Sequence, residues 1–227
     1  MKENIKWLFF DMGGVILDDT KPETLRQEIL FNVAQRYLPN ITMANIYEAW
    51  LFASQQPGSV RINALHYLFK DSKLKEEAEL VYNNECNVDY YGLSKVRPEA
   101  MEVLSGLSKS FNLGIMANQN VKAGNVLEDA GLLQYFSHQK MSGHIGLQKP
   151  DPNFYLEILK DSGALPSESV LIDDNWYRGL LQAKLLGLST ILYKREIIPI
   201  PDSAEPDKFI SSLAELTEIF ESKQKRS

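Results

Sequence analysis

A short apolar run opens the chain and ends at a carboxylate. Residues Ile5 to Phe10 are mostly aromatic or β-branched, and Asp11 and the glycines Gly13 and Gly14 follow them. Such a run is typical of a buried parallel strand that leads into a loop. Similar apolar runs predict three further strands, near residues 111–117, 169–173 and 189–193.

The stretch from Pro22 to about Asp89 has a different pattern. Its apolar residues recur at helical spacing and are interrupted by breaks such as Pro39-Asn40 and Pro57-Gly58. Strand-like alternation is not evident there, so the pattern predicts a compact set of helices. The expected helices cover residues 22–37, 43–55, 60–70 and 74–87.

Strands and helices alternate after Pro98. Helices are expected over residues 98–109, 121–130, 152–162, 177–186 and 208–221, with a Pro-rich surface loop at 199–206. This alternation predicts an α/β fold with a doubly wound parallel sheet, whose ligands bind beyond the carboxyl ends of the strands. We therefore expect a core domain of residues 1–18 and 96–227, with residues 19–95 inserted as an all-helical domain after the first strand.

The composition argues against some classes of function but does not identify one. The 227 residues carry a formal net charge of −6, which argues against nucleic acid as the main partner. A single cysteine excludes an intrachain disulfide and suits a reducing compartment. No apolar stretch is long enough for a membrane span, so we expect a cytoplasmic protein without a membrane partner, either a monomer or a homodimer.

Chemistry is suggested where strands end. Asp11 leaves a buried strand beside glycines, whose close turn lets backbone N–H groups cradle an anion. An aspartate followed by glycines is also a common turn, so this stretch alone leaves both interpretations open. Asp173 and Asp174 end another strand, and two adjacent acids favour either a cation such as Mg²⁺ or, for one of them, a helix-capping role.

A lysine precedes one of the predicted helices. Lys149 is followed by Pro150, and Asp151-Pro152 then open the helix, with Asp151 at the expected N-cap. A plain helix start accounts for Asp151 and Pro152 but not for Lys149. The lysine therefore joins the acids as a candidate functional residue.

The order of these stretches resembles the haloacid dehalogenase-like hydrolase superfamily over nearly the whole chain. The resemblance implies a Rossmann-like core, a helical cap and, most often, hydrolysis of phosphate esters through an aspartyl-phosphate. It implies Asp11 and Lys149 as catalytic residues, and a site for Mg²⁺ formed by Asp11, Gly13, Asp173 and Asp174. It also implies a small phosphorylated substrate, contacted by Met12, Gly13, Gly14, Asn118 and Lys149.

The chain departs from the family pattern at three places. Gly13 stands where a second aspartate usually acts as general acid and base, and Ala117 stands where Ser or Thr usually binds phosphate, with Asn118 as the expected substitute. Gly179, Ala183 and Gly187 fall one residue late, as if one residue were inserted near Trp176. Trp176 and Tyr177 then either bulge toward the cleft or pack against the sheet.

Three functions are compatible with these residues. The first is a magnesium-dependent phosphatase of small phosphorylated metabolites. The second is a metal-free 2-haloacid dehalogenase, in which the paired acids Asp173 and Asp174 would be hard to explain. The third is a catalytically impaired member that binds a ligand or a partner, for which Gly13 and Ala117 are the evidence.

Overall fold

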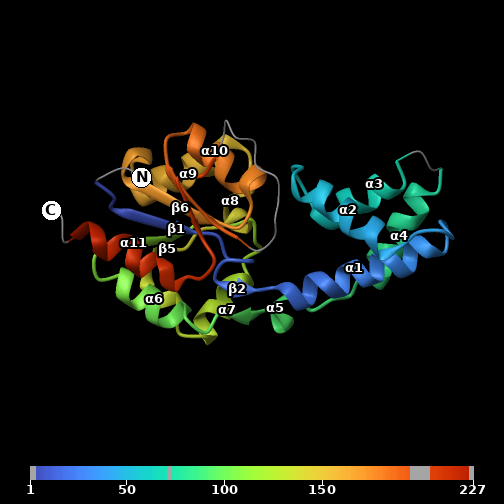
Figure 1. Cartoon of the computed structure of the whole chain (residues 1–227), viewed down its shortest axis with the longest axis horizontal. Helices are drawn as coiled ribbons and strands as arrows, with labels where there is room; N and C mark the ends of the chain where they lie inside the picture. Colours follow the sequence, from blue (N-terminus) through green and yellow to red (C-terminus); the bar gives the residue numbers. More distant parts are fainter. Residues whose placement is uncertain (1–3, 71–72, 195–204, 225–227) are drawn as a thin grey trace. The chain divides into compact units, whose positions relative to one another are not determined.

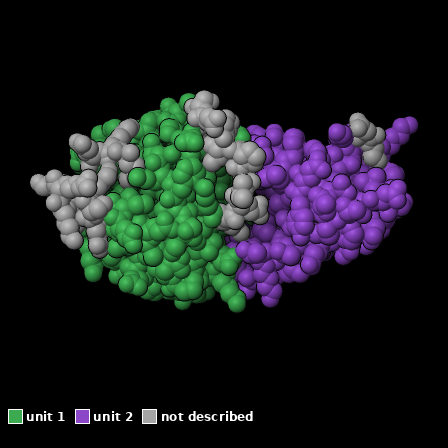
Figure 2. Space-filling view, in the orientation of Figure 1, with its two compact units in different colours: residues 1–18, 95–227 green, residues 19–94 purple. Residues whose placement is uncertain are grey.

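The computed structural model describes residues 4–70, 73–194 and 205–224. Its contacts divide the chain into two compact units, coloured separately in Figure 2. Unit 1 comprises Met1–Asp18 and Lys95–Ser227, and unit 2 comprises Asp19–Ser94. Within the described residues, none of the helices combines the length and apolar character that crossing a bilayer requires.

Unit 1 is built on a six-stranded sheet with the order β5-β4-β1-β6-β7-β8. Every neighbouring pair in this sheet is parallel, which confirms the predicted α/β fold. The strands are β1 (Trp7–Phe10), β4 (Asn112–Ile115), β5 (Phe136–His138), β6 (Ser169–Asp173), β7 (Ser189–Tyr193) and β8 (Lys208–Ile210). A separate antiparallel pair joins β2 (Leu17–Asp18) to β3 (Lys95–Val96).

Helices cover both faces of this sheet (Figure 1). α9 (Pro152–Ser162) and α10 (Leu181–Leu185) lie on one face, and α6 (Ala100–Leu107) and α11 (Ala214–Gln224) lie on the other. The shorter helices α7 (Ala123–Asp129) and α8 (Ser142–Ile145) connect strands of the same unit. With both faces covered, the central strand β1 is buried throughout Leu8, Phe9 and Phe10, as a strand of a parallel sheet must be.

The strand order sets where polar side chains gather. β1 lies between β4 and β6, and all three strands run in the same direction. Because their carboxyl ends meet at one edge, the residues that follow them are brought together there. Those residues include Asp11 after β1, Ala117 and Asn118 after β4, and Asp174 after β6.

Unit 2 is helical and has its own core. Its helices are α1 (Thr20–Gln35), α2 (Met43–Ser54), α3 (Val60–Leu68), α4 (Lys75–Glu85) and α5 (Tyr90–Leu93). Apolar residues of the first four helices pack into one cluster, which includes Leu30, Ala49, Leu65, Phe69 and Tyr82. The helical spacing read from the sequence therefore reflects a buried face on each of these helices.

One prediction for unit 1 was wrong, and the remaining strands of the two sheets were not predicted. The helix expected over residues 208–221 does not start at Lys208. Residues Lys208–Ile210 instead form β8, an edge strand parallel to β7, and the helix α11 starts at Ala214. Asp207 explains the difference, since its carboxylate accepts hydrogen bonds from the backbone N–H (2.8 Å) and hydroxyl (3.0 Å) of Thr190 and so ties the segment to β7. β5 and the β2–β3 pair were missed. The expected loop at 199–206 lies outside the described residues except for its last two positions.

The helix expected over residues 177–186 begins with an irregular turn. Trp176–Leu180 form a π-helical turn, η3, which continues into α10. The Leu180 N–H donates to the Asn175 carbonyl five residues earlier, at 3.1 Å. A π-turn accommodates one additional residue, which explains the late glycines. Trp176 is buried in the same apolar cluster as Phe9 and does not bulge outward.

Candidate active site

Asp11 directly follows β1, and backbone hydrogen bonds hold it in place. Its N–H donates to the Ile172 carbonyl of β6 at 2.9 Å, and the residue is only 9% exposed. Gly14 adopts a φ of 75°, a left-handed conformation that glycine takes at little cost and that turns the chain sharply after Asp11. The Arg97 guanidinium fixes this turn by donating to the carbonyls of Gly14 (3.0 Å) and Val15 (2.9 Å).

Lys149 connects two of the carboxylates. Its Nζ lies 2.6 Å from Asp11 Oδ1 and 2.6 Å from Asp173 Oδ2, and the residue is 4% exposed. The helix that follows is anchored as the sequence predicted, with the Asp151 carboxylate accepting from the Asn153 N–H at 2.8 Å and Pro152 in the first turn. Lys149 is thus placed by a loop that ends at a capped helix.

Asp173 has a partner on each oxygen. Oδ2 accepts from Lys149, and Oδ1 accepts from the Asn175 N–H at 2.8 Å. The Asn175 side chain in turn accepts from the Arg178 N–H at 2.9 Å and so begins the π-turn. The carboxylate is 2% exposed, so these contacts set its position without competition from bulk water.

The charges in this cluster influence one another strongly. Burial raises the pKa of the Asp11 carboxyl to about 7, opposed by the Lys149 ammonium and reinforced by Asp173 and Asp174. Burial alone would lower the pKa of Lys149, but its two carboxylate partners outweigh this effect and raise it. Lys149 therefore remains an ammonium, and the acids around it outnumber it.

The donor set fits a hard divalent cation. Asp11, Asp173 and Asp174 each offer a carboxylate oxygen, and these oxygens lie within 4.8 Å of one another. With all three carboxylates ionised, the cluster and its one ammonium would carry a net charge of two minus, which a single divalent cation would cancel. Carboxylate oxygens in such a group are the ligands that Mg²⁺ prefers.

The remaining predicted residues lie in the adjoining loops, and some are already engaged. The Gly14 N–H donates to the Leu17 carbonyl at 2.8 Å, so it is committed within the loop, whereas Met12 and Gly13 precede it directly after Asp11. The Asn118 side chain binds the backbone of Lys149, donating to its carbonyl (2.9 Å) and accepting from its N–H (2.7 Å). Asn118 therefore braces Lys149, while the buried Ala117 offers no hydroxyl.

Several supporting residues were not found from the sequence. Arg97 and Asn175 hold the loops that carry Asp11 and Asp173, and Tyr155 of α9 donates its hydroxyl to the Gly179 carbonyl at 2.7 Å. None was among the candidate site residues predicted from the sequence. The only signals were the position of Arg97 where the chain returns to unit 1 and the displaced spacing of Gly179.

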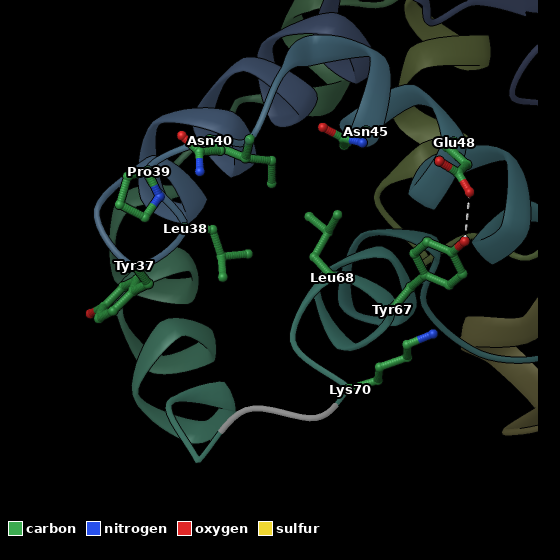
Figure 3. Close-up of a pocket in the computed structure, with 10 residues that line it drawn as sticks. Tyr37, Leu38, Pro39, Asn40, Asn45, Glu48, Tyr67, Leu68 and Lys70 are labelled. Atoms are coloured by element: carbon green, nitrogen blue, oxygen red, sulfur yellow. Dashed lines mark hydrogen bonds between the residues drawn. The ribbon is translucent and has the colours of Figure 1, made fainter.

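A separate pocket of about 450 Å³ lies within unit 2 (Figure 3). Leu38 and Leu68 line it, and Tyr67 donates its hydroxyl to Glu48 at 2.7 Å at its margin. All of its lining residues belong to unit 2, whereas the acidic cluster belongs to unit 1. The pocket therefore contains none of the candidate reactive groups.

Comparison with known proteins identifies the class that this fold and site define. A model of the family described as haloacid dehalogenase-like hydrolases matches residues 5–187. The chain belongs to this family of hydrolases. The family resemblance found in the sequence is confirmed.

Curated relatives and solved structures agree with this assignment. Glyceraldehyde 3-phosphate phosphatase of Pyrococcus furiosus is 25% identical over 96% of this chain and 93% of the relative. Phosphoserine phosphatase of Thermus thermophilus is 32% identical, over 40% of this chain and 36% of the relative. A HAD-hydrolase from Bacillus subtilis bound to magnesium has the same fold, with a TM-score of 0.68 and 21% identity over 95% of this chain and 98% of the other.

Proposed function

We propose that the protein is a magnesium-dependent phosphatase of small phosphorylated metabolites, with Asp11 as the nucleophile. The observation that carries this proposal is the convergence of the carboxylates of Asp11, Asp173 and Asp174 on one another, with the first two sharing the Lys149 ammonium. The named relatives support the substrate class, because glyceraldehyde 3-phosphate, phosphoserine and D-ribitol 5-phosphate are all small phosphomonoesters. Since the reactive groups belong to unit 1, we assign unit 2 as the cap domain that selects the substrate.

The reaction begins with the approach of an anionic phosphate to an anionic carboxylate. The Lys149 ammonium, 2.6 Å from Asp11 Oδ1, orients the nucleophile and offsets part of the repulsion. The backbone N–H groups of Met12 and Gly13 receive phosphoryl oxygens. Asp11, Asp173, Asp174 and the carbonyl of Gly13 would hold Mg²⁺, which when bound neutralises charge on the phosphoryl group.

Two displacements then complete the reaction. A carboxylate oxygen of Asp11 attacks phosphorus, the bond from phosphorus to the ester oxygen breaks, and the leaving alkoxide takes a proton from water. A water molecule next attacks the phosphorus of the aspartyl-phosphate, which releases inorganic phosphate and regenerates the Asp11 carboxylate. Gly13 has no acidic side chain to protonate the leaving group, so we expect esters with good leaving groups to react fastest.

The acidic cluster also weighs against the two alternatives. A metal-free dehalogenase would have to keep three neighbouring carboxylates next to one ammonium without a further cation. A solved 2-haloacid dehalogenase from Pseudomonas syringae has a similar fold, with a TM-score of 0.60 at 21% identity, and fold alone does not separate the two reactions. An impaired binding protein would have no need of a lysine shared between two buried acids.

The decisive assay is phosphate release from a panel of phosphomonoesters, with and without Mg²⁺. Wild type is compared with Asp11→Asn and with a matched control, Asp129→Asn, which changes an exposed aspartate at the end of α7. We expect release that requires Mg²⁺, is abolished by Asp11→Asn and is unchanged by Asp129→Asn. Halide release from 2-haloacids without metal, or ligand binding without turnover, would instead support one of the alternatives.

A further inference from the structure

The π-turn η3 lies directly against the carboxylate of Asp173. A Cβ atom placed on Gly179 would lie 2.2 Å from Asp173 Oδ2 and 2.3 Å from its Cγ. An ordinary contact of this kind begins near 3.4 Å. The carboxylate can therefore occupy its position only because residue 179 has no side chain.

A buried tyrosine holds the π-turn in this place. The Tyr155 hydroxyl lies 2.7 Å from the Gly179 carbonyl and 3.0 Å from the Arg178 carbonyl, and it can donate to either. The widened turn interrupts the regular hydrogen-bond pattern of the α-helix at these carbonyls. A side-chain donor therefore stabilises the turn, because buried carbonyls need a hydrogen-bond partner. Tyr155 is fully buried on α9, the helix that starts three residues after Lys149, and so links the loop of Lys149 to the turn behind Asp173.

We propose that Gly179 and Tyr155 are positioning residues for the reaction, which act by setting the place of the Asp173 carboxylate and, through it, the Lys149 ammonium. This inference rests on the function proposed above. A methyl group at residue 179 would lie 2.2 Å from the carboxylate, whereas an ordinary contact begins near 3.4 Å. The carboxylate would therefore have to move away by about 1 Å. The 2.6 Å contact from Asp173 to Lys149 would then lengthen, and the ammonium shared with Asp11 would shift.

The inferred roles predict a particular pattern of change in the variants. In Gly179→Ala we expect Mg²⁺ to bind about 10–100-fold more weakly and kcat to fall by a similar factor, as for other residues that orient metal ligands. KM should change little, because the backbone N–H groups that receive the phosphate are untouched. Tyr155→Phe removes only the hydroxyl and should change Mg²⁺ affinity and kcat in the same direction by a smaller factor.

Two matched controls separate positioning from a general loss of stability. Gly106→Ala makes the same change in α6, where a Cβ would meet nothing within 4 Å. Tyr82→Phe also removes a buried hydroxyl that donates to a backbone carbonyl, that of Arg26 at 3.2 Å, but it lies in unit 2. Both controls should keep wild-type Mg²⁺ affinity and kcat, even where Tyr82→Phe lowers the melting temperature.

The experiment is calorimetric titration of each metal-free protein with Mg²⁺, followed by steady-state kinetics with an aryl phosphate. Weaker Mg²⁺ binding and lower kcat in Gly179→Ala and Tyr155→Phe, but in neither control, would support the inference. Wild-type values in both variants would overturn it and leave the proposed function intact, and Tyr155→Phe alone decides the matter if Gly179→Ala does not fold. A wild-type protein that neither binds Mg²⁺ nor releases phosphate would overturn the proposed function as well.

Discussion

Replacing Lys149 with methionine should affect both stability and catalysis. Methionine keeps much of the buried side-chain volume but removes the ammonium that lies 2.6 Å from Asp11 and 2.6 Å from Asp173. Removing one partner of a buried ion pair costs about 3–5 kcal/mol, because the other partner is left buried without compensation. Protonation of one carboxyl would relieve part of this cost, so we expect the lower end, about 3 kcal/mol at neutral pH without metal.

Thermal unfolding of the metal-free protein measures this effect. A loss of about 3 kcal/mol corresponds to a melting temperature lower by about 6–12 °C in a protein of this size. The catalytic loss should be about 10²–10³-fold in kcat, as when one group that stabilises a transition-state charge is removed. Both effects come from the same two contacts.

Lys140→Met is the matched control for this substitution. Lys140 also pairs with an aspartate, Asp161, at 2.7 Å, but its side chain is 45% exposed. Exposed pairs contribute about 0–1 kcal/mol, so this variant should remain close to wild type in both stability and kcat. The electrostatic reasoning would be refuted if Lys149→Met unfolded at the temperature of Lys140→Met.

Three further outcomes are expected. Asn118→Ala should lose about 1–3 kcal/mol of stability and at least about tenfold in kcat, since two hydrogen bonds to the Lys149 backbone disappear; an unchanged kcat would show that this bracing is unimportant. Burial opposes ionisation of Asp207, but its bonds from Thr190 and Lys184 prevail and lower its pKa. In urea unfolding at pH 7, the free energy of unfolding of wild type should therefore exceed that of Asp207→Asn by about 1 kcal/mol. This difference should disappear as the pH falls through 4 and below, and a difference that does not change with pH would contradict the reasoning. Because Gly13 supplies no acid, kcat/KM should fall steeply from aryl to alkyl phosphates; equal rates would indicate an acid elsewhere in the protein.

The parts of the fold predicted best are those with the plainest local pattern. β6 and β7 were placed at their observed bounds because each contains a short run of three apolar residues, and α9 was placed by its Asp-Pro start. β5 was missed because it has only three residues, too few for a strand pattern to be recognised in the sequence. The β2–β3 pair has only two residues on each strand and forms because distant parts of the chain meet.

The candidate site was predictable to the extent that it depends on strand ends. Asp11, Asp173 and Asp174 could be placed together because parallel strands bring their following loops to one edge, whereas Lys149, which precedes a helix, was assigned to the same site by the family resemblance. The contact between Gly179 and Asp173 could not, since it depends on how a π-turn is seated against a neighbouring side chain. The role of Asn118 also could not be predicted from the local sequence, because its partner is the backbone of a residue 31 positions away.

Anomalous diffraction from crystals grown with Mn²⁺ in place of Mg²⁺ tests most directly whether Asp11 and the paired acids form one cation site. We predict a single strong peak in unit 1 at coordination distance, about 2.0–2.2 Å, from a carboxylate oxygen of Asp11 and from the Asp173-Asp174 pair. A fully occupied peak elsewhere, in a protein that hydrolyses phosphate esters with the same Mn²⁺, would contradict that assignment.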